Sequence, residues 1–191
     1  MDRCGWCGDL DIYVAYHDQE WGVPEWDSRA LWEKLVLDGF QAGLSWLTIL
    51  RKRDAFRAAF HGFDPEKVAA MGDTDVARLL QDPGIVRHRG KIEAAIKGAR
   101  VWIQIEEKGP GFGSLIWDRV DGAPIQNQYR TAQEVPTQDA LSLAISKDLR
   151  ARGFTFVGPT IVYAWMEACG LMNNHLTSCF RHKIVADFGQ G

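Results

Sequence analysis

Cysteine and histidine residues near both ends of the chain are the most distinct set of possible metal ligands. Cys4 and His17 lie near the N-terminus, and His175 and Cys179 lie near the C-terminus in the pattern H-x-x-x-C. Residues four apart face the same way on a helical turn, so His175 and Cys179 could enter one coordination sphere. Two thiolates and two imidazoles complete a tetrahedral shell, which suits structural zinc and would tie the chain ends together.

The spacing leaves other roles for the cysteines open. Cys4 and Cys7 form a C-x-x-C, which could supply two ligands by itself or act as a redox dithiol, although no βαβ pattern surrounds it. Alternatively, all four cysteines are small buried apolar residues and His17 lies at the surface. Cys169, next to Ala168 on an apolar helix face, is expected in the core.

Aromatic residues are concentrated at the N-terminal end. Five of the eight tryptophans fall in the first 46 residues, together with Tyr13 and Tyr16. A buried tryptophan needs a partner for its N–H, so this excess indicates a stacking pocket for a planar ligand such as a base. The alternative is a large aromatic core. The five tryptophans are Trp6, Trp21, Trp26, Trp32 and Trp46.

Asp38 stands in an otherwise apolar run, between Leu37 and Gly39. Such an acid is either exposed at a helix C-terminus, where the helix dipole disfavours it, or turned inward to meet a cationic or hydrogen-bonding ligand. The second option accounts for an unfavourable position, and Gly39 and Gly43 would let the backbone bring Asp38 and Trp46 into one pocket.

Two basic clusters could bind a phosphate backbone. One is the run Arg87-His88-Arg89-Gly90-Lys91, and the other comprises Lys147, Arg150 and Arg152. The second cluster precedes a turn with Gly153 and Gly158, and a helix starting after Gly158 would present free N–H groups to an anion. Together they offer one face for a nucleic acid backbone, although charged residues at helix ends are usually only solvated.

The elements that must position these residues are predicted to be helices nearly throughout, which makes the fold class all-α. The predicted helices cover 28 to 38 with a stop at Gly39, 45 to 56, a short helix from Asp64-Pro65, one from Asp73, 90 to 106, 137 to 153, and a last helix from Gly158-Pro159 to Gly170. The only notable strand candidate is 154 to 157, and 107 to 136 is predicted to be an irregular connection.

Composition bounds the class of protein. The chain has 191 residues, a net charge of −3 and 25% charged residues, as in an ordinary single globular domain over 1–191. Long disorder, a collagenous repeat and a histone-like basic protein are excluded, but a local basic face is not. Without an apolar stretch long enough for a membrane span or signal core, no membrane partner and a cytoplasmic location are expected.

The residues discussed above fall on runs that resemble the 3-methyladenine DNA glycosylase I family, a helix-hairpin-helix group of DNA repair enzymes. The matching runs span Arg3 to Cys179 in order. They are RCGW (3 to 6), YHDQEWGVP (16 to 24), QAGLSW (41 to 46), FDPEKVAAM (63 to 71), GIVRHRGKI (84 to 92), RGFTFVGPTIVYAWMEACGL (152 to 171) and the H-x-x-x-C at 175 to 179.

The resemblance implies a two-lobed helical bundle with the chain ends joined by a zinc site, and hydrolysis of the N-glycosidic bond of alkylated purines, chiefly 3-methyladenine. It implies alkylated double-stranded DNA as the partner of a protein acting as a monomer. Its implied site comprises a base pocket of Tyr16, Trp46, Trp21 and the catalytic Asp38, zinc ligands Cys4, His17, His175 and Cys179, and DNA-backbone contacts in the hairpin at Gly153, Val157, Gly158 and Thr160. The basic run described above adds Arg87, Arg89 and Lys91 to the predicted backbone contacts.

Two departures from the family pattern leave alternatives. Family members usually carry Glu where this chain has Asp38, so the carboxylate is one methylene shorter, and a non-catalytic binder of alkylated DNA is one alternative function. Cys7 is not part of the family's zinc shell and could compete with Cys4. A zinc-dependent hydrolase of small molecules is disfavoured, because a closed shell of four protein ligands leaves no open position for a catalytic water.

Overall fold

The computed structural model describes residues 2–188, and this part of the chain is mostly helical, as the all-α prediction requires. The α-helices are α1 (Asp11–Gln19), α2 (Ser28–Gln41), α3 (Trp46–Leu50), α4 (Arg53–Ala59), α5 (Pro65–Ala69), α6 (Asp73–Leu79), α7 (Arg89–Lys108), α8 (Phe112–Trp117), α9 (Ala140–Arg152), α10 (Pro159–Ala168) and α11 (Phe180–Phe188). Short 3-10 helices cover Gly5–Cys7, His61–Phe63, Asp118–Val120 and Ala132–Glu134. Strands β1 (Ile125–Gln126) and β2 (Met172–Asn173) pair in parallel.

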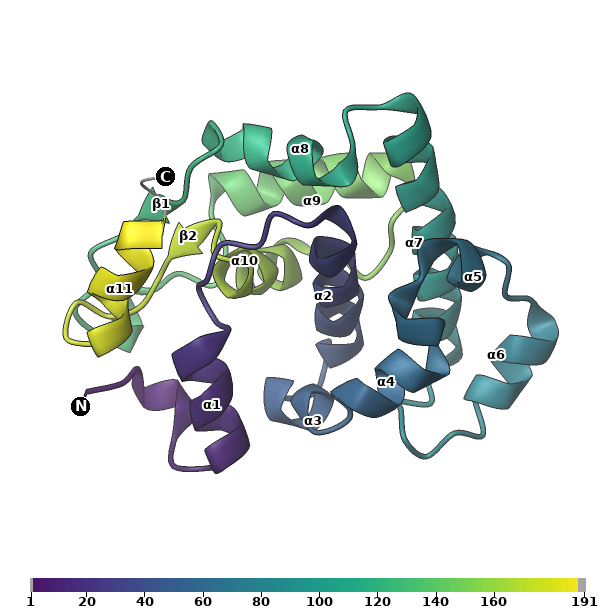
Figure 1. The fold of residues 1–191 in the computed structure, drawn as a ribbon, viewed down its shortest axis with the longest axis horizontal. Coiled ribbons are helices and arrows are strands. Elements are labelled where there is room, and N and C mark those ends of the chain that lie inside the picture. Colours follow the sequence, from purple (N-terminus) through teal and green to yellow (C-terminus); the bar gives the residue numbers. More distant parts are fainter. Residues whose placement is uncertain (1, 189–191) are drawn as a thin grey trace.

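Helix α2 stands in the middle of the molecule (Figure 1). On one side of it, α5 and α6 pack against the long helix α7, and on the other side lie α1, α10 and α11. Helix α3 lies below α2 and contacts both α2 and α1. The N-terminal segment reaches the start of α11, where the Phe180 N–H donates to the carbonyl of Asp2 at 3.0 Å. Residues from the two ends of the chain are therefore neighbours.

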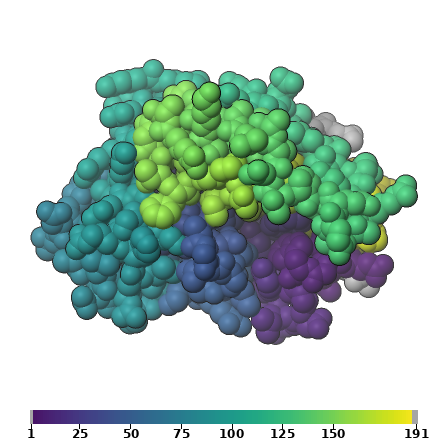
Figure 2. Space-filling view, turned by 180° about the vertical axis from the view of Figure 1, so that it is seen from behind, coloured from purple at the N-terminus to yellow at the C-terminus, as the bar shows by residue number. Residues whose placement is uncertain are grey.

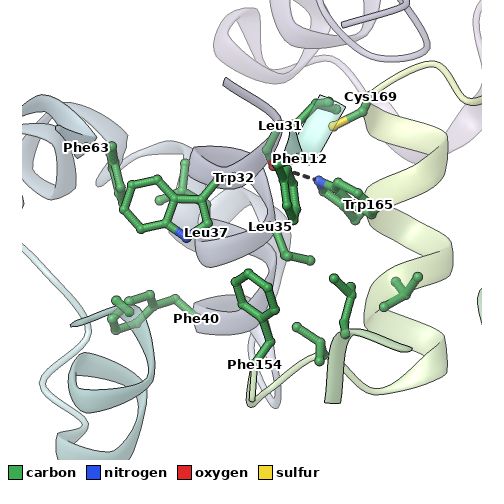
Figure 3. Packing of buried hydrophobic residues seen from close by; sticks show 14 of the residues in the cluster. Leu31, Trp32, Leu35, Leu37, Phe40, Phe63, Phe112, Phe154, Trp165 and Cys169 are labelled. Carbon is green, nitrogen blue, oxygen red and sulfur yellow. Dashed lines mark hydrogen bonds between the residues drawn. The ribbon is translucent and has the colours of Figure 1, made fainter. Parts of the chain in front are cut away.

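The apolar face of α2 forms the centre of the hydrophobic core (Figure 3). Trp32 and Trp165 are fully buried, and the indole N–H of Trp165 on α10 donates to the carbonyl of Leu31 at 3.0 Å. Truncating a buried tryptophan of this kind to alanine costs about 3 to 5 kcal/mol. Packing against α10 thus holds helix α2 in place.

Helix α2 is longer than predicted, because it does not stop at Gly39. The side chain of Asp27 caps its first turn by accepting from the Ala30 N–H, and the helix runs on to Gln41. A Cβ at Gly39 would come within 3.3 Å of the Phe156 carbonyl oxygen, so this glycine allows close packing instead of ending the helix. Asp38 therefore lies inside the helix, and it is buried.

Three other predictions of local structure were wrong. The helix expected over 45 to 56 is two helices, α3 and α4, separated at Arg51 and Lys52. The strand expected over 154 to 157 is the turn between α9 and α10, in which Phe156 has a φ of 57°. The connection over 107 to 136 contains α8, whose side chains are largely buried.

The remaining differences concern the ends of the chain. Helix α1 was not predicted, because its buried residues are only Tyr16 and His17 and its apolar periodicity is weak. The helix ending near Gly170 is not the last, since α11 follows it. Within residues 2–188, no helix is both long and apolar enough to cross a membrane.

Candidate active site

The four predicted metal ligands converge on one buried point. The ligand atoms of Cys4, His17, His175 and Cys179 all lie within 4.8 Å of one another. The Sγ of Cys179 is 3.5 Å from His17 Nε2 and 3.6 Å from His175 Nδ1, and the Sγ of Cys4 is also 3.6 Å from that nitrogen. Zinc bonded to sulfur and nitrogen at usual lengths in a tetrahedron would separate such atoms by about 3.6 Å. The cluster has the donor types and spacing to hold a metal ion.

The atoms around the cluster orient its two imidazoles. Asp18 Oδ1 lies 2.7 Å from His17 Nδ1, and the carboxylate of Asp18 is held by the guanidinium of Arg3. The Nε2 of His175 lies 3.0 Å from the carbonyl oxygen of Trp21. Each outer nitrogen can therefore carry the proton, which leaves the inner nitrogen free as a ligand. A Cβ at Gly22 would approach His175 Nε2 to 2.9 Å, so a side chain there would disturb this arrangement.

The remaining cysteines have other surroundings. The thiol of Cys7 donates to the carbonyl of Cys4 at 3.2 Å and lies outside the four-residue cluster. Cys169 is buried in the hydrophobic core, as predicted, and burial raises the pKa of its thiol. Neither cysteine is placed to take the position of Cys4 in the cluster.

A cavity of about 400 Å³ opens beside the cysteine and histidine cluster. It lies between the N-terminal residues, drawn in purple, and the green segments above them, where the face in Figure 2 is hollowed. All four residues predicted to bind a base line it, and so do Cys4 and Thr160. The four are Tyr16, Trp21, Asp38 and Trp46.

Aromatic side chains form much of the cavity wall. The rings of Tyr16 and Trp46 are 5.3 Å apart and tilted by 43°, and Trp6 meets Trp21 edge-on at 5.1 Å. The aromatic surplus at the N-terminal end thus divides between two roles: Trp6, Trp21 and Trp46 line the cavity, whereas Trp32 is in the core and Trp26 stacks on Trp117. Such walls suit a planar ligand.

Asp38 is turned inward, which is the second of the two orientations considered for it. Its Oδ1 accepts a 2.6 Å hydrogen bond from the ammonium of Lys34, one helical turn earlier. Burial raises the pKa of Asp38, and the charge of Lys34 opposes that rise. Among the described residues, neither Asp38 Oδ2 nor Trp46 Nε1 has a hydrogen-bond partner although both atoms are buried. Asp38 and Trp46 both line the cavity, so its wall contains one buried acceptor and one buried donor whose hydrogen-bonding capacity is unused.

A second carboxyl group, Glu167 on α10, also lines the cavity. Burial raises the pKa of Glu167 to about 7, while a hydrogen bond from the Asn174 amide at 2.8 Å opposes the shift and the charge of Asp38 adds to it. Asn174 also donates to the hydroxyl of Tyr163. Near neutral pH the charge of the cavity thus depends on Glu167.

Replacing Glu167 by Gln is expected to change how stability depends on pH. The folded-state pKa is above the unfolded value of 4.5, so the stabilising effect is complete below about pH 4.5 and is lost as the pH rises through about 7. In the natural protein the free energy of unfolding should fall by up to about 3 kcal/mol over this range. Glu167→Gln should not show this fall, because the amide keeps the acceptor for Asn174 but does not titrate. Urea unfolding between about pH 5 and 9 measures this difference. The exposed Glu107→Gln serves as a control, and equal pH profiles for Glu167→Gln and the natural protein would contradict the prediction.

The predicted backbone-binding residues lie close together at the start of α7 and the turn before α10. His88 packs edge-on against Phe156 at 5.9 Å, which joins the basic run to the turn. Gly153 ends α9 with a φ of 111°, a conformation favourable to glycine, and Ser146 Oγ donates to the Val157 carbonyl at 2.6 Å. The turn is thereby fixed, Arg87 and Arg89 are exposed, and Gly158 is the N-cap of α10.

Lys91 requires a correction. It was expected to contact a phosphate backbone, but its side chain is buried and its ammonium donates to the carbonyls of Phe40 and Ala42, at 2.9 and 2.6 Å. Burial lowers the pKa of Lys91. The ammonium satisfies carbonyl groups at the C-terminal end of α2, which have no partner within the helix. Lys91 therefore supports the end of α2 and does not face a phosphate.

Two charged residues of the cavity were missed from the sequence. Lys34 and Asp38 are four apart on one helix, a spacing typical of an ion pair, but the pair was not considered. Glu167 interrupts the apolar pattern of α10 much as Asp38 interrupts that of α2, and this signal could have identified it. Gln41, Tyr13 and Tyr163 also line the cavity and carry no distinctive pattern.

Comparison with known proteins assigns most of the chain to one family. A family model described as methyladenine glycosylase matches residues 6–182. The chain is 54% identical over 179 residues to DNA-3-methyladenine glycosylase 1 of Escherichia coli (strain K12), covering 94% of this chain and 96% of the relative.

Solved structures agree with this relationship. A crystal structure of 3-methyladenine DNA glycosylase I superposes with a TM-score of 0.92 at 52% identity, over 94% of this chain and 98% of that one. A structure of 3-methyladenine DNA glycosylase I from Staphylococcus aureus, described as giving the basis of 3-methyladenine recognition, has a TM-score of 0.91 at 42% identity, over 94% of this chain and 96% of that one.

Proposed function

The chain belongs to the methyladenine glycosylase family and is a DNA repair enzyme that hydrolyses N-glycosyl bonds, and we propose that it does so with the damaged base in the cavity of Tyr16, Trp46 and Asp38. One observation carries the proposal: a cavity with aromatic walls holds a buried carboxylate oxygen and an indole N–H that have no partner among residues 2–188. An alkylated adenine supplies a donor amino group, ring acceptors and a planar surface.

In this proposal, catalysis depends mainly on selecting the damaged base. Alkylation at N3 places a positive charge on the purine, so the glycosidic bond is already weakened. The enzyme extrudes the nucleotide at a cost of a few kcal/mol of unstacking, and the cavity accepts the damaged base. The exocyclic amino group donates to Asp38 Oδ2, while Tyr16 and Trp46 contact the ring. Trp21 completes the wall beside them.

The bond then breaks without a covalent enzyme intermediate. Its electron pair moves to the ring nitrogen and leaves the base neutral, and water attacks the sugar carbon and gives up one proton to solvent. Asn173 stands where many helix-hairpin-helix glycosylases carry an aspartate, but here its amide donates to Gln126 and to the carbonyl of His182. Asn173 does not line the cavity, whereas Asp38 and Glu167 do, and the acidic group assigned to the base is Asp38. A covalent DNA adduct trapped with borohydride would argue against this mechanism.

The segment from α9 to α10 is the proposed helix-hairpin-helix element, and the two groups of helices around α2 are the proposed two lobes (Figure 1). The first-turn N–H groups of α10, beginning near Thr160, are oriented for a phosphate. Thr160 also lines the cavity, so a backbone held at Gly153, Val157 and Gly158 would lie next to the flipped base. We also propose double-stranded DNA as the substrate. We propose a monomer as the active form, since one chain supplies the residues that line the cavity.

Cys4, His17, His175 and Cys179 would hold zinc, because two thiolates and two imidazoles at tetrahedral spacing are the donor set that zinc prefers. Zinc in such a closed shell contributes stability and no open coordination position. Leu176 and Cys4 both line the cavity, so the cluster also supports its wall. The role assigned to the metal is structural.

The proposal is tested by measuring release of free 3-methyladenine from methylated duplex DNA. The natural protein should release it, and a Trp46→Ala variant should be much slower although it still binds undamaged DNA. A variant as active as the natural protein would show that the base does not bind in this cavity. A natural protein that binds lesion DNA but releases no base would instead favour the non-catalytic binder.

The backbone-binding face has its own expected result. Arg87→Ala and Arg89→Ala should each make the plot of log binding constant against log salt concentration less steep. The slope should become less negative by about 0.9, because each variant removes one phosphate contact. Lys91→Met should leave that slope unchanged and lower the free energy of unfolding by about 1 to 3 kcal/mol, because two carbonyls lose their donor. Fluorescence anisotropy with duplex DNA and urea unfolding give the two measurements. An equal change of slope for all three variants would contradict the correction made for Lys91.

A further inference from the structure

Glu167 adds a second carboxyl group to the wall of the cavity that holds Asp38. Asp38 belongs to α2 and Glu167 to α10, two helices that pack against each other (Figure 1). Most of α10 is apolar, and a partly buried acid in such a helix loses hydration unless a polar partner replaces the water. One of the two carboxyl oxygens of Glu167 has such a partner, and the other has none among residues 2–188.

The oxygen with a partner is held in a fixed orientation. Oε1 of Glu167 accepts a hydrogen bond from the Asn174 amide nitrogen at 2.8 Å. Asn174 is buried, and its oxygen accepts from the Asn127 amide at 2.7 Å, while its nitrogen also donates to the Tyr163 hydroxyl at 2.9 Å. These bonds keep the N–H groups of Asn174 directed at Oε1 of Glu167. The oxygen of Glu167 left for a ligand is therefore Oε2.

The surroundings of the two carboxyl groups favour a charge on Asp38 and a proton on Glu167. Asp38 accepts from the ammonium of Lys34 at 2.6 Å, whereas the hydrogen-bond partner of Glu167 is an uncharged amide. Burial raises the pKa of Glu167 to about 7, and the charge of Asp38 adds to that rise. Two acids that share a cavity with one cation are expected to carry one negative charge between them. Because Oε1 accepts from Asn174, the proton of the neutral acid lies on Oε2.

We propose that Glu167, as a neutral carboxylic acid, donates a hydrogen bond from Oε2 to a ring nitrogen beside the amino group of the bound base. Asp38 accepts from the amino group itself, so the two side chains recognise a donor and an acceptor that lie side by side on adenine. Guanine presents two acceptors on the same edge, and one of them would face the carboxylate of Asp38. Glu167 is thus a specificity-determining residue for the reaction. The inference rests on the proposed function, because it takes this cavity as the base site.

The other titratable groups of the cavity wall have different properties. Burial raises the pKa of each of the three tyrosines, so their phenols stay protonated near pH 7. Asp38 and Lys34 form an ion pair, and Cys4 belongs to the proposed metal cluster. A hydrogen-bond donor lost near pH 7 is therefore assigned to Glu167. The other groups are Asp38 and Lys34 on α2, Tyr13 and Tyr16 on α1, Tyr163 on α10, and Cys4.

The test is calorimetric titration of free 3-methyladenine into the natural protein, Glu167→Gln and Glu167→Met. The Gln variant keeps the acceptor for Asn174 and presents N–H₂ in place of the proposed O–H, so its affinity should lie within about threefold of the natural value at about pH 6. The Met variant has a similar size and no donor, and it should bind at least about fivefold more weakly.

The dependence on pH should distinguish the natural protein from the Gln variant. The acid of the natural protein loses its proton as the pH rises through about 7, so its affinity should fall at least about fivefold relative to Glu167→Gln between about pH 6 and 8.5. Taking the ratio of the two affinities at each pH cancels titration of the ligand itself. If Glu167→Met does not fold, as judged by thermal unfolding, this ratio still decides the result.

Nitrogen NMR of isotopically labelled 3-methyladenine separates a hydrogen bond from a change in cavity shape. At about pH 6, the resonance of one ring nitrogen should move upfield on binding to the natural protein and to Glu167→Gln, because an acceptor nitrogen gains a donor. The same nitrogen should lack this shift in Glu167→Met.

Other results would overturn the inference. These are equal affinities for all three proteins, a ratio of natural to Glu167→Gln affinity that does not fall with pH, or ring-nitrogen resonances that are the same in the natural protein and Glu167→Met. Trp46→Ala separates such a failure from failure of the proposed function. If Trp46→Ala loses 3-methyladenine binding while both Glu167 variants bind normally, only the role of Glu167 is wrong. If Trp46→Ala binds as well as the natural protein, the base site itself is wrong.

Discussion

Replacing Asp38 by Asn should lower the rate of 3-methyladenine release from methylated DNA by about 100-fold or more, the usual effect of losing one preorganised charged group in an active site. The amide keeps an oxygen that can accept from Lys34, so the fold around the ion pair is little disturbed. It loses the charge and presents an N–H₂ in place of the unpartnered Oδ2 that is proposed to accept from the base. The effect should therefore fall on the reaction, and single-turnover kinetics with excess enzyme measures it directly.

Asp38→Glu is the matched variant, since it restores the residue usual in the family and keeps the charge. The longer side chain should retain release within about tenfold of the natural rate, because adding one methylene within a cavity of about 400 Å³ costs little packing. Affinity for undamaged duplex DNA, measured by anisotropy, should be unchanged in both variants. Release by Asp38→Asn at the natural rate would show that the carboxylate does not contact the reacting base.

Features that depend on one element could be predicted from the sequence. The N-cap Asp64 followed by Pro65 begins α5, and the Asp64 side chain accepts from the Lys67 N–H as such a cap should. For this cap the physical cause lies within four residues, so no tertiary contact was needed. The H-x-x-x-C spacing also predicted that His175 and Cys179 share one cluster, but they do so in the segment between β2 and α11 and not on a helical turn.

Features that depend on the crossing of elements could not be predicted. Lys91 looked like part of a solvated basic run, but its acceptors, the carbonyls of Phe40 and Ala42, come from a helix about fifty positions earlier in the chain. Lys34 meets Trp46 only because α3 folds back beside α2. The charge and spacing of residues predict contacts within one helix. The partner of a buried ammonium on another helix depends on how the two helices pack, which the sequence does not show directly.

Replacing Cys179, one of the four proposed metal ligands, should have the largest effect on stability. Cys179→Ser is expected to abolish stoichiometric zinc in the purified protein and to lower the free energy of unfolding by at least about 3 kcal/mol, because metal binding contributes directly to folding free energy. For a chain of this size the loss corresponds to a Tm lower by about 6 to 12 °C. Cys7→Ser should keep both zinc and Tm, since the Cys7 thiol binds the Cys4 carbonyl and lies outside the cluster.

Cys179→Ser should also weaken base binding, because the four-residue cluster and the cavity share a wall. Trp21 packs edge-on against His175 at 4.6 Å and lines the cavity, so loosening the imidazole loosens the aromatic wall. Metal analysis, calorimetry with 3-methyladenine and thermal unfolding separate the effects. If Cys7→Ser alone lost zinc, Cys7 would replace Cys4 as a ligand. If Cys179→Ser kept zinc and Tm, the four-residue cluster would not be a metal site, and hydrogen bonds alone would join the two chain ends.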